Sequence, residues 1–335
     1  MKRINFLLMT FLIALFYSIP VHAQVSMKKL AQSTMNFLSV SVLPRASAMG
    51  NAYTAVGVGA ESIFYNPAGL SHSSQKYNAI LARTSWIADI NYNTGALSWD
   101  MGNIGVFGLS FLMVDYGDIH GTRLTRSPAD PIGYEDIGTL DNVGAYSYGL
   151  SYSRQISTKF SLGGTIQYVG QQLGDNVIGG STIENKESSI SFNLGVLYYT
   201  GFKSFRFGMV IRNFGPAIEY QEVSTSLPLN FVMGGAMDLM DLFMPGNTSD
   251  SSLLFSLGFS HPNNYTERVN VGAEYTFLNM LSLRGGYEFN QDIAGLTAGF
   301  GVTPEIAGSK LDFSYSYSDF DLFQGVNRLS IAVSF

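Results

Sequence analysis

The sequence predicts an all-β protein: a transmembrane antiparallel β-barrel of about 14 strands, with an N-terminal hatch or plug segment in its lumen. Charged residues make up only 13% of the 335 residues, and aromatic residues also make up 13%. That charged share is about half the usual value for soluble domains. Beyond the first 23 residues, no apolar run is long enough for a membrane helix. Because backbone polar groups must be paired inside lipid, such a chain can cross a membrane only as a closed barrel.

The first 23 residues have the pattern of a secretory signal peptide. Basic Lys2 and Arg3 precede an apolar run that ends in Val21-His22-Ala23, with small residues at the outer positions of a cleavage site. A membrane anchor is the alternative, but no basic stop-transfer cluster follows the run. We expect export and a mature chain from Gln24, more acidic than the net charge of −6 of the full sequence. This acidic balance argues against nucleic acid as a partner.

Residues 24–75 differ in composition from the rest and are expected to form the hatch. Residues 46–60 contain five Ala and three Gly, and a short helical turn from Glu61 ends at Asn66-Pro67. Pro67 and Gly69 are expected to turn the chain into the first strand. A fourteen-stranded lumen is too wide for wall side chains to fill, so these small residues suit a plug. A flexible tail is the alternative, and it would expose several large apolar residues.

Residues 76–335 alternate with a period of two, which predicts strands with one side in a nonpolar medium. A soluble β-sandwich alternates too, but strands of ten or more residues that end in aromatics favour a membrane barrel. Four apolar side chains are expected to face lipid: Phe160, Ile166, Phe192 and Val196. Gln167 and Asn193 are expected to face the lumen. An arginine in place of Asn193 should therefore be tolerated better than an arginine in place of Val196. The expected strands lie near 77–86, 90–101, 103–115, 142–157, 159–172, 188–200, 203–213, 229–240, 252–261, 266–277, 281–290, 293–303, 309–318 and 326–335.

The connections and the last strand predict how the barrel is oriented. Short turns alternate with longer loops at 116–141, 173–187 and 214–229, so both chain ends are expected to face the periplasm. The terminal strand closes on Phe335, which looks like the signal read by the outer-membrane insertion machinery. We therefore expect the outer membrane of a Gram-negative-type bacterium, with its lipid and this machinery as partners.

The stretch "FLSVSVLPRASAMGNAYTAVGVGAESIFYNPAGL", residues 37–70, resembles the N-terminal signature of the PorV/PorQ family of outer-membrane barrels, relatives of FadL-type transporters. The chain departs from the family pattern at Pro44 and at residues 57–60, and its barrel region matches only in general character. The matching residues, taken as the hatch motif, include Arg45, Ala46, Met49, Gly50, Asn66, Pro67, Ala68 and Gly69.

This resemblance implies both a place for the motif and a function. The motif is expected inside the lumen. The protein is expected to take part in type IX secretion or in surface attachment, with secreted cargo or type IX secretion components as partners. The alternative is a FadL-like channel for hydrophobic small molecules such as fatty acids.

Charged residues on the polar faces of later strands are expected to face the lumen and to need partners there. Arg268 and Glu274 lie on one expected strand, and Arg284 and Glu288 lie on its neighbour, so ion pairs are expected between these two strands. The simplest role for these charges is to attach the hatch to the wall. Residues 104–114 are apolar on both faces, which predicts a lumen patch covered by the hatch or by a hydrophobic ligand. The full set of lumen-facing charges is Arg206, Arg212, Arg268, Glu274, Arg284, Glu288 and Asp312.

No catalytic residue, metal site or cofactor is predicted, and the chain is expected not to be an enzyme. The absence of cysteine excludes disulfides and thiolate chemistry. The few histidines form no H-E-x-x-H motif, and S-x-x-K at 26–29 and 73–76 lacks the companion motifs of β-lactam chemistry. Acidic residues in the loop 116–141 could bind calcium, but a solvated acidic loop is the favoured explanation.

Overall fold

The computed structural model describes residues 32–124, 133–140, 142–178, 181–220, 222–243, 250–291, 295–320, 323 and 325–335. The expected signal peptide and residues 24–31 of the expected hatch lie outside these ranges. Among the helices described, none is long and apolar enough to cross a membrane.

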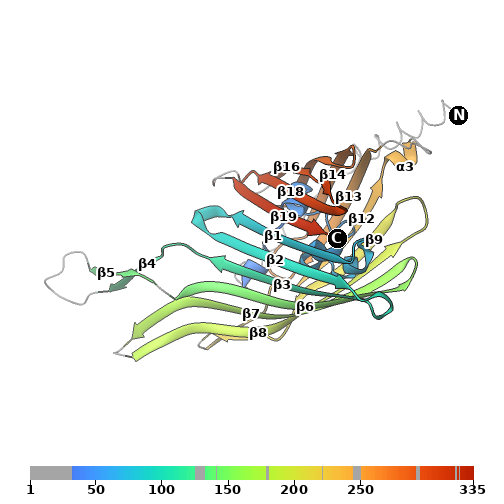
Figure 1. Ribbon diagram of the computed structural model, residues 1–335. Coiled ribbons are helices and arrows are strands. Elements are labelled where there is room, and N and C mark those ends of the chain that lie inside the picture. Colours follow the sequence, from blue (N-terminus) through green and yellow to red (C-terminus); the bar gives the residue numbers. More distant parts are fainter. Residues whose placement is uncertain are drawn as a thin grey trace, which may run out of the picture.

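The described chain forms a closed antiparallel barrel of fourteen strands (Figure 1), as the sequence predicts. Sequential barrel strands pair with one another, and β19 pairs with β1 to close the wall. The short β17 (Glu305–Ile306) pairs with β18 at one rim. The barrel strands are β1 (Tyr77–Ser85), β2 (Asn91–Asp100), β3 (Val106–Asp115), β6 (Val143–Ser157), β7 (Phe160–Ile178), β8 (Ser181–Tyr199), β9 (Arg206–Phe214), β12 (Asn230–Asp238), β13 (Ser252–Pro262), β14 (Arg268–Phe277), β15 (Leu281–Phe289), β16 (Leu296–Val302), β18 (Ser309–Ser318) and β19 (Val326–Ser334).

The largest differences from the expected strands lie in the long loops. β7 and β8 continue several residues beyond the expected ends, and the loops at 116–141 and 214–229 contain two additional hairpins. These hairpins are β4 (His120–Leu124) with β5 (Tyr134–Thr139), and β10 (Ile218–Tyr220) with β11 (Val223–Thr225). These hairpins do not bury an apolar face in lipid, so their sequences lack the two-residue alternation that predicts the barrel strands. Pairing with the neighbouring strand stabilises them instead.

The two ends of the barrel differ. At the tight-turn end, short connections join the strands, and Tyr77 meets Phe335 through paired backbone hydrogen bonds of 2.8 and 3.0 Å and rings 5.3 Å apart. One connection at this end carries the short helix α3 (Met240–Phe243). At the loop end, β4–β5 and the tips of β7 and β8 project from the barrel in the same direction (Figure 1).

The strand faces separate as the alternation predicts. Ile166 and Phe192 are exposed on the outer surface, and Phe160 and Val196 are partly exposed. Gln167 and Asn193 are 8% and 4% exposed inside the barrel. The outer wall is rich in exposed Leu, Ile, Phe and Tyr, which suits contact with lipid.

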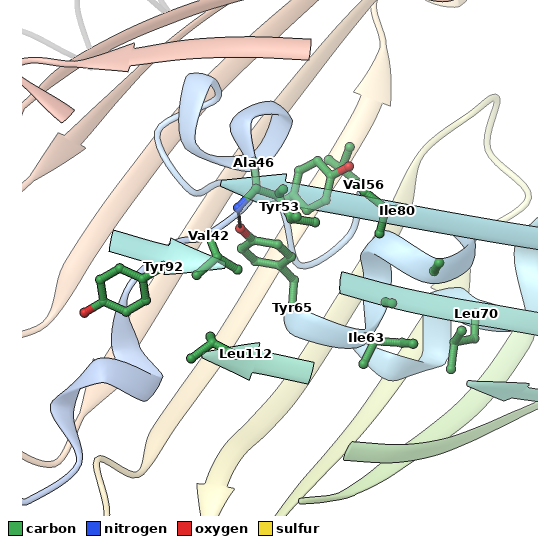
Figure 2. Packing of buried hydrophobic residues seen from close by; sticks show 14 of the residues in the cluster. Val42, Ala46, Tyr53, Val56, Ile63, Tyr65, Leu70, Ile80, Tyr92 and Leu112 are labelled. Atoms are coloured by element: carbon green, nitrogen blue, oxygen red, sulfur yellow. Dashed lines mark hydrogen bonds between the residues drawn. The ribbon is translucent and has the colours of Figure 1, made fainter. Parts of the chain in front are cut away.

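Residues 33–72, here called the N-terminal segment, lie inside the barrel against the inner faces of strands around its circumference. Their buried side chains form one core with inward residues of β1, β2 and β3, and Tyr53 and Tyr65 meet edge to face at 5.0 Å near its centre (Figure 2). Pro67 begins a third 3₁₀ helix, not the expected direct turn into β1. The helices are η1 (Asn36–Ser39), α2 (Pro44–Ala48), η2 (Gly59–Phe64) and η3 (Pro67–His72), with η4 (Ile87–Asp89) and η5 (Gly102–Ile104) in strand connections.

Candidate functional site

Arg45 joins the N-terminal segment to the wall. Proline at the first position of α2 fits a helix start and places Arg45 on the next residue. Its Nε and Nη2 donate to the two carboxylate oxygens of Glu274 at 2.9 and 2.7 Å, and its Nη1 donates to Glu61 at 2.8 Å. Glu61 also accepts from the Tyr53 hydroxyl at 2.6 Å. Arg284 completes the network by donating to Glu274 at 2.5 Å. A bidentate arginine–carboxylate pair fixes both distance and orientation.

Met49 and Gly50 turn directly against two wall glycines. A Cβ at Gly286 would lie 2.1 Å from the Gly50 nitrogen, and a Cβ at Gly272 would lie 2.3 Å from the Met49 oxygen. The Gly50 carbonyl accepts from Asn270 at 2.5 Å. The segment approaches the wall here backbone to backbone, which only glycine permits.

The Asn66–Gly69 part of the motif is held from three directions. Asn66 Oδ1 accepts from the Ala68 nitrogen at 3.2 Å and caps η3, while its Nδ2 donates to carbonyls of Thr54 and Val196 at 2.9 and 3.0 Å. Ala68 is fully buried. Gly69 packs so tightly that a Cβ would lie 2.2 Å from the oxygen of Gly57. Together with fully buried Ala46, every residue of the expected motif lies in the packed part of the segment.

Two further lumen-facing arginines donate to backbone carbonyls of the segment. Arg206 Nε donates to the Ala55 carbonyl at 2.6 Å, and Arg212 Nη1 donates to the Phe64 carbonyl at 3.2 Å. Asp312, by contrast, accepts from neighbouring hydroxyls of the wall itself.

Of the expected cross-strand ion pairs, the structure forms Arg284 with Glu274. Glu288 accepts from the Asn51 amide at 2.7 Å, and no ion pair joins it to Arg268 among the described residues. Arg268 instead lies over the Tyr265 ring at 4.6 Å. The Asn51 contact belongs to the N-terminal segment, so the strand pattern alone does not reveal it.

Arg328 is an inward charge that the sequence analysis did not identify. It is 2% exposed, and its Nε donates to the Ser41 carbonyl at 2.9 Å. Its guanidinium carbon lies 5.6 Å from the Trp86 ring centre. The alternation in β19, where Leu329 and Ile331 face outward, carries the signal that would have placed Arg328 inside.

Two of the cavities that the described residues line inside the barrel lie toward its opposite ends. The larger, about 900 Å³, lies at the tight-turn end and is lined in part by Arg45, Glu61, His72 and Glu274. Burial, with a smaller contribution from Arg206, lowers the pKa of His72 from 6.5 to about 4, so its ring is neutral at pH 7. The smaller cavity, about 310 Å³, lies toward the loop end.

The inner face of β3 is apolar, as expected, and the N-terminal segment covers it. Val106, Leu112 and Val114 are buried in the same core as Phe37 and Ile63. The two larger cavities therefore have lining rich in polar and charged side chains. No group of acidic residues and histidines within the described ranges is arranged to hold a metal ion.

The fold resembles solved outer-membrane channels at low sequence identity. The CymD monoaromatic hydrocarbon channel is 15% identical with a TM-score of 0.58, and covers 88% of this chain and 98% of its own. The Pseudomonas putida toluene transporter TodX is 13% identical with a TM-score of 0.56, covering 88% and 99%. A Pseudomonas aeruginosa FadL homologue is 12% identical with a TM-score of 0.55, covering 88% and 98%. These likenesses establish a FadL-like barrel fold.

The sequence itself matches a family of secretion proteins. No curated protein matches the chain. The family model for the type IX secretion system membrane protein PorP/SprF matches residues 129–322, more than half of the chain. Residues 37–70 lie outside that match, so the finer resemblance to PorV/PorQ stays a prediction. The chain therefore belongs to the PorP/SprF family of type IX secretion system membrane proteins.

Proposed function

We propose that this barrel is a non-enzymatic interaction component of type IX secretion in the outer membrane, and that its loop end binds secreted cargo or another secretion component. The observation that carries the proposal is the pair of projections at the loop end, β4–β5 and the tips of β7 and β8 (Figure 1). Membership of the PorP/SprF family supplies the pathway.

The projections present apolar side chains away from the barrel core. Tyr134 and Ile137 on β5 are 53% and 49% exposed, and Leu173 on β7 is 49% exposed. These exposed apolar side chains on the projections are the positions at which we expect contact with another protein. Glu135 and Asp136 lie between the two β5 positions. Glu135 is paired with Arg123 at 3.3 Å, so Asp136 is the carboxylate here that suits a basic group of the partner.

The filled lumen also favours binding over conduction. The N-terminal segment is joined to the wall by the Arg45–Glu274 pair and by the packing of its backbone against Gly272 and Gly286. A barrel with such a fixed interior can serve as a rigid platform for its loops.

The test compares two double variants in a host with an active type IX system. Tyr134→Ser with Ile137→Ser changes the loop end, whereas Met101→Ser with Phe202→Ser changes exposed apolar residues at the tight-turn end. The first should reduce release of type IX cargo and recovery of a partner from detergent extracts, and the second should leave both unchanged. Equal effects of the two variants, or normal secretion by the first, would count against the proposal.

A channel for hydrophobic molecules is the second candidate, because the similar solved structures include a hydrocarbon channel and a toluene transporter. The apolar inner face of β3 would suit such a ligand if the N-terminal segment moved away from it. Uptake of labelled toluene by cells with and without the barrel distinguishes the two. Uptake that rises with the amount of barrel would support the channel.

A further inference from the structure

The smaller cavity is lined by more positively charged than negatively charged side chains. Its lining includes two guanidinium groups, Arg212 and Arg268, and one carboxylate, Glu288. A third guanidinium, that of Arg328, does not line the cavity but donates to the carbonyl of Ser41, which does. Positive charge therefore exceeds negative charge around this cavity.

Neither lining arginine has a carboxylate partner among the described residues. Arg212 donates through Nη1 to a neutral carbonyl, and its buried Nε has no hydrogen-bond partner in the described part of the chain. The buried Nε of Arg268 likewise has none, and its guanidinium stacks on a ring. Glu288 is engaged by the Asn51 amide. A partly buried guanidinium without a counter-ion is unfavourable, so a negative group in the cavity beside both arginines would be stabilised.

Neutral polar groups complete the lining. Among the described residues, Asn51 and Asn230 each have a buried amide oxygen that accepts no hydrogen bond, and Ser260 and Asn270 also line the cavity. An anion alone would satisfy the guanidinium groups but would bring no donor to these oxygens. A ligand that carries hydroxyl or amine groups beside its anionic group would satisfy both kinds of side chain.

The dimensions restrict the ligand to a small molecule. The volume of about 310 Å³ is at the lower end of ligand pockets, roughly 300–1,000 Å³. Two of the lining side chains are hydrogen-bonded to each other, since Asn264 donates to Asn36 at 2.8 Å, and Asn264 also donates to Ser33 at 2.5 Å.

We infer that this cavity binds a small organic anion, a carboxylate or phosphate that also carries hydroxyl or amine donors. The guanidinium groups of Arg212 and Arg268 hold its anionic group, and the amides of Asn51 and Asn230 lie beside its donor groups. Binding of this kind goes beyond the proposed role in secretion and does not depend on it.

The binding test uses the purified full chain in detergent at neutral pH and isothermal titration with four probes: citrate, gluconate, sulfate, which has no hydrogen-bond donor, and neutral glucose. Citrate or gluconate should bind more tightly than sulfate, and glucose should not bind. Glucose binding as tight as that of gluconate would overturn the role of charge. Sulfate binding more tightly than both organic anions would overturn the role of the donor groups. Absence of binding by all four would overturn the site.

Variants connect any binding to the cavity. Arg268→Gln should weaken binding of the best probe by about ten- to a hundredfold, because hydrogen bonds to charged groups are strong. Arg268→Lys should retain part of it. Glu288→Gln should tighten binding, since it removes the negative charge in the lining, whereas a purely structural role for Glu288 predicts no gain.

Arg154→Gln is the matched control, because Arg154 is an exposed arginine of β6 outside the cavity. Migration of unheated samples on gels verifies that each variant forms a barrel. Unchanged binding in folded Arg268→Gln, or equal losses in Arg154→Gln, would place the bound anion elsewhere and overturn the inference. If Arg268→Gln does not fold, Arg268→Lys and Glu288→Gln carry the same test.

Discussion

At the scale of single residues, Arg45 is the side chain that most directly couples the N-terminal segment to the barrel. Its partners Glu61 and Glu274 come from the segment and from β14, so one guanidinium bridges the two. Glu274 is 4% exposed and therefore depends on its arginine partners for stabilisation of its charge.

Arg45→Met should destabilise the folded protein by about 3 kcal/mol, because it leaves buried acidic groups with fewer partners. Arg83→Met is the control, since Arg83 is an exposed arginine of β1 that makes no ion pair with the described residues. Urea unfolding in lipid vesicles measures both. A loss for Arg45→Met no larger than for the control would contradict the bridging role.

Two adjacent glycines provide a sharper comparison. Gly286 faces inward against the Gly50 backbone, whereas a Cβ at Gly285 would meet nothing within 4 Å. Gly286→Ala should destabilise the protein by roughly 1–3 kcal/mol, the range for overpacking, and Gly285→Ala should be nearly neutral. Protease sensitivity of the segment in folded barrels should rise only for Gly286→Ala. Equal behaviour of the two variants would show that the backbone contact is not tight.

At the scale of elements, each strand has a lipid side and a lumen side, but the lumen side is not uniformly hydrated. Asn193 donates to Gln167 at 3.1 Å and accepts from the Asn213 nitrogen at 2.8 Å while buried. The expectation that an arginine is tolerated better at Asn193 than at Val196 stays a prediction, but Asn193 is 4% exposed and hydrogen-bonded on both sides, so it is a poor position at which to test it.

A better inward control is Thr276 on β14, which lines the larger cavity. Val196→Arg on the outer face of β8 should destabilise the barrel by about 2–4 kcal/mol if it lies near the bilayer midplane, whereas Thr276→Arg keeps access to water and should be milder. Folding yields into liposomes compare them. A similar penalty at both positions would indicate that Val196 does not contact lipid.

At the scale of the whole molecule, the barrel and its contents act as one packed unit. The N-terminal segment contacts strands around the wall and leaves separate cavities toward the two ends. A fourteen-stranded barrel without that segment would have an open lumen.

We therefore expect the full chain to show little conductance in planar bilayers, and a variant without residues 33–72 to show large, stable openings. Migration of unheated samples on gels checks that the shortened chain still forms a barrel. High conductance of the full chain would mean that the segment does not block the lumen.

The sequence by itself determined the strands and their faces, because two-residue alternation is a local property. It also placed Arg284 and Glu274 close enough to pair, since adjacent antiparallel strands bring them into register. The β7–β8 extensions were not predicted, because strands outside the membrane lack the apolar face on which the prediction depends.

Only the tertiary structure decided what fills the barrel. The contact between Arg45 and Glu274 joins residues 229 positions apart, and the pairing of Glu288 with Asn51 likewise crosses from the wall to the segment. Alternation shows that a charge faces inward but not which segment it meets there. The way the wall closes around residues 33–72 decides which residue of the segment meets each inward charge. Arg212 and Arg268 lie beside a cavity because no carboxylate of the segment reaches them.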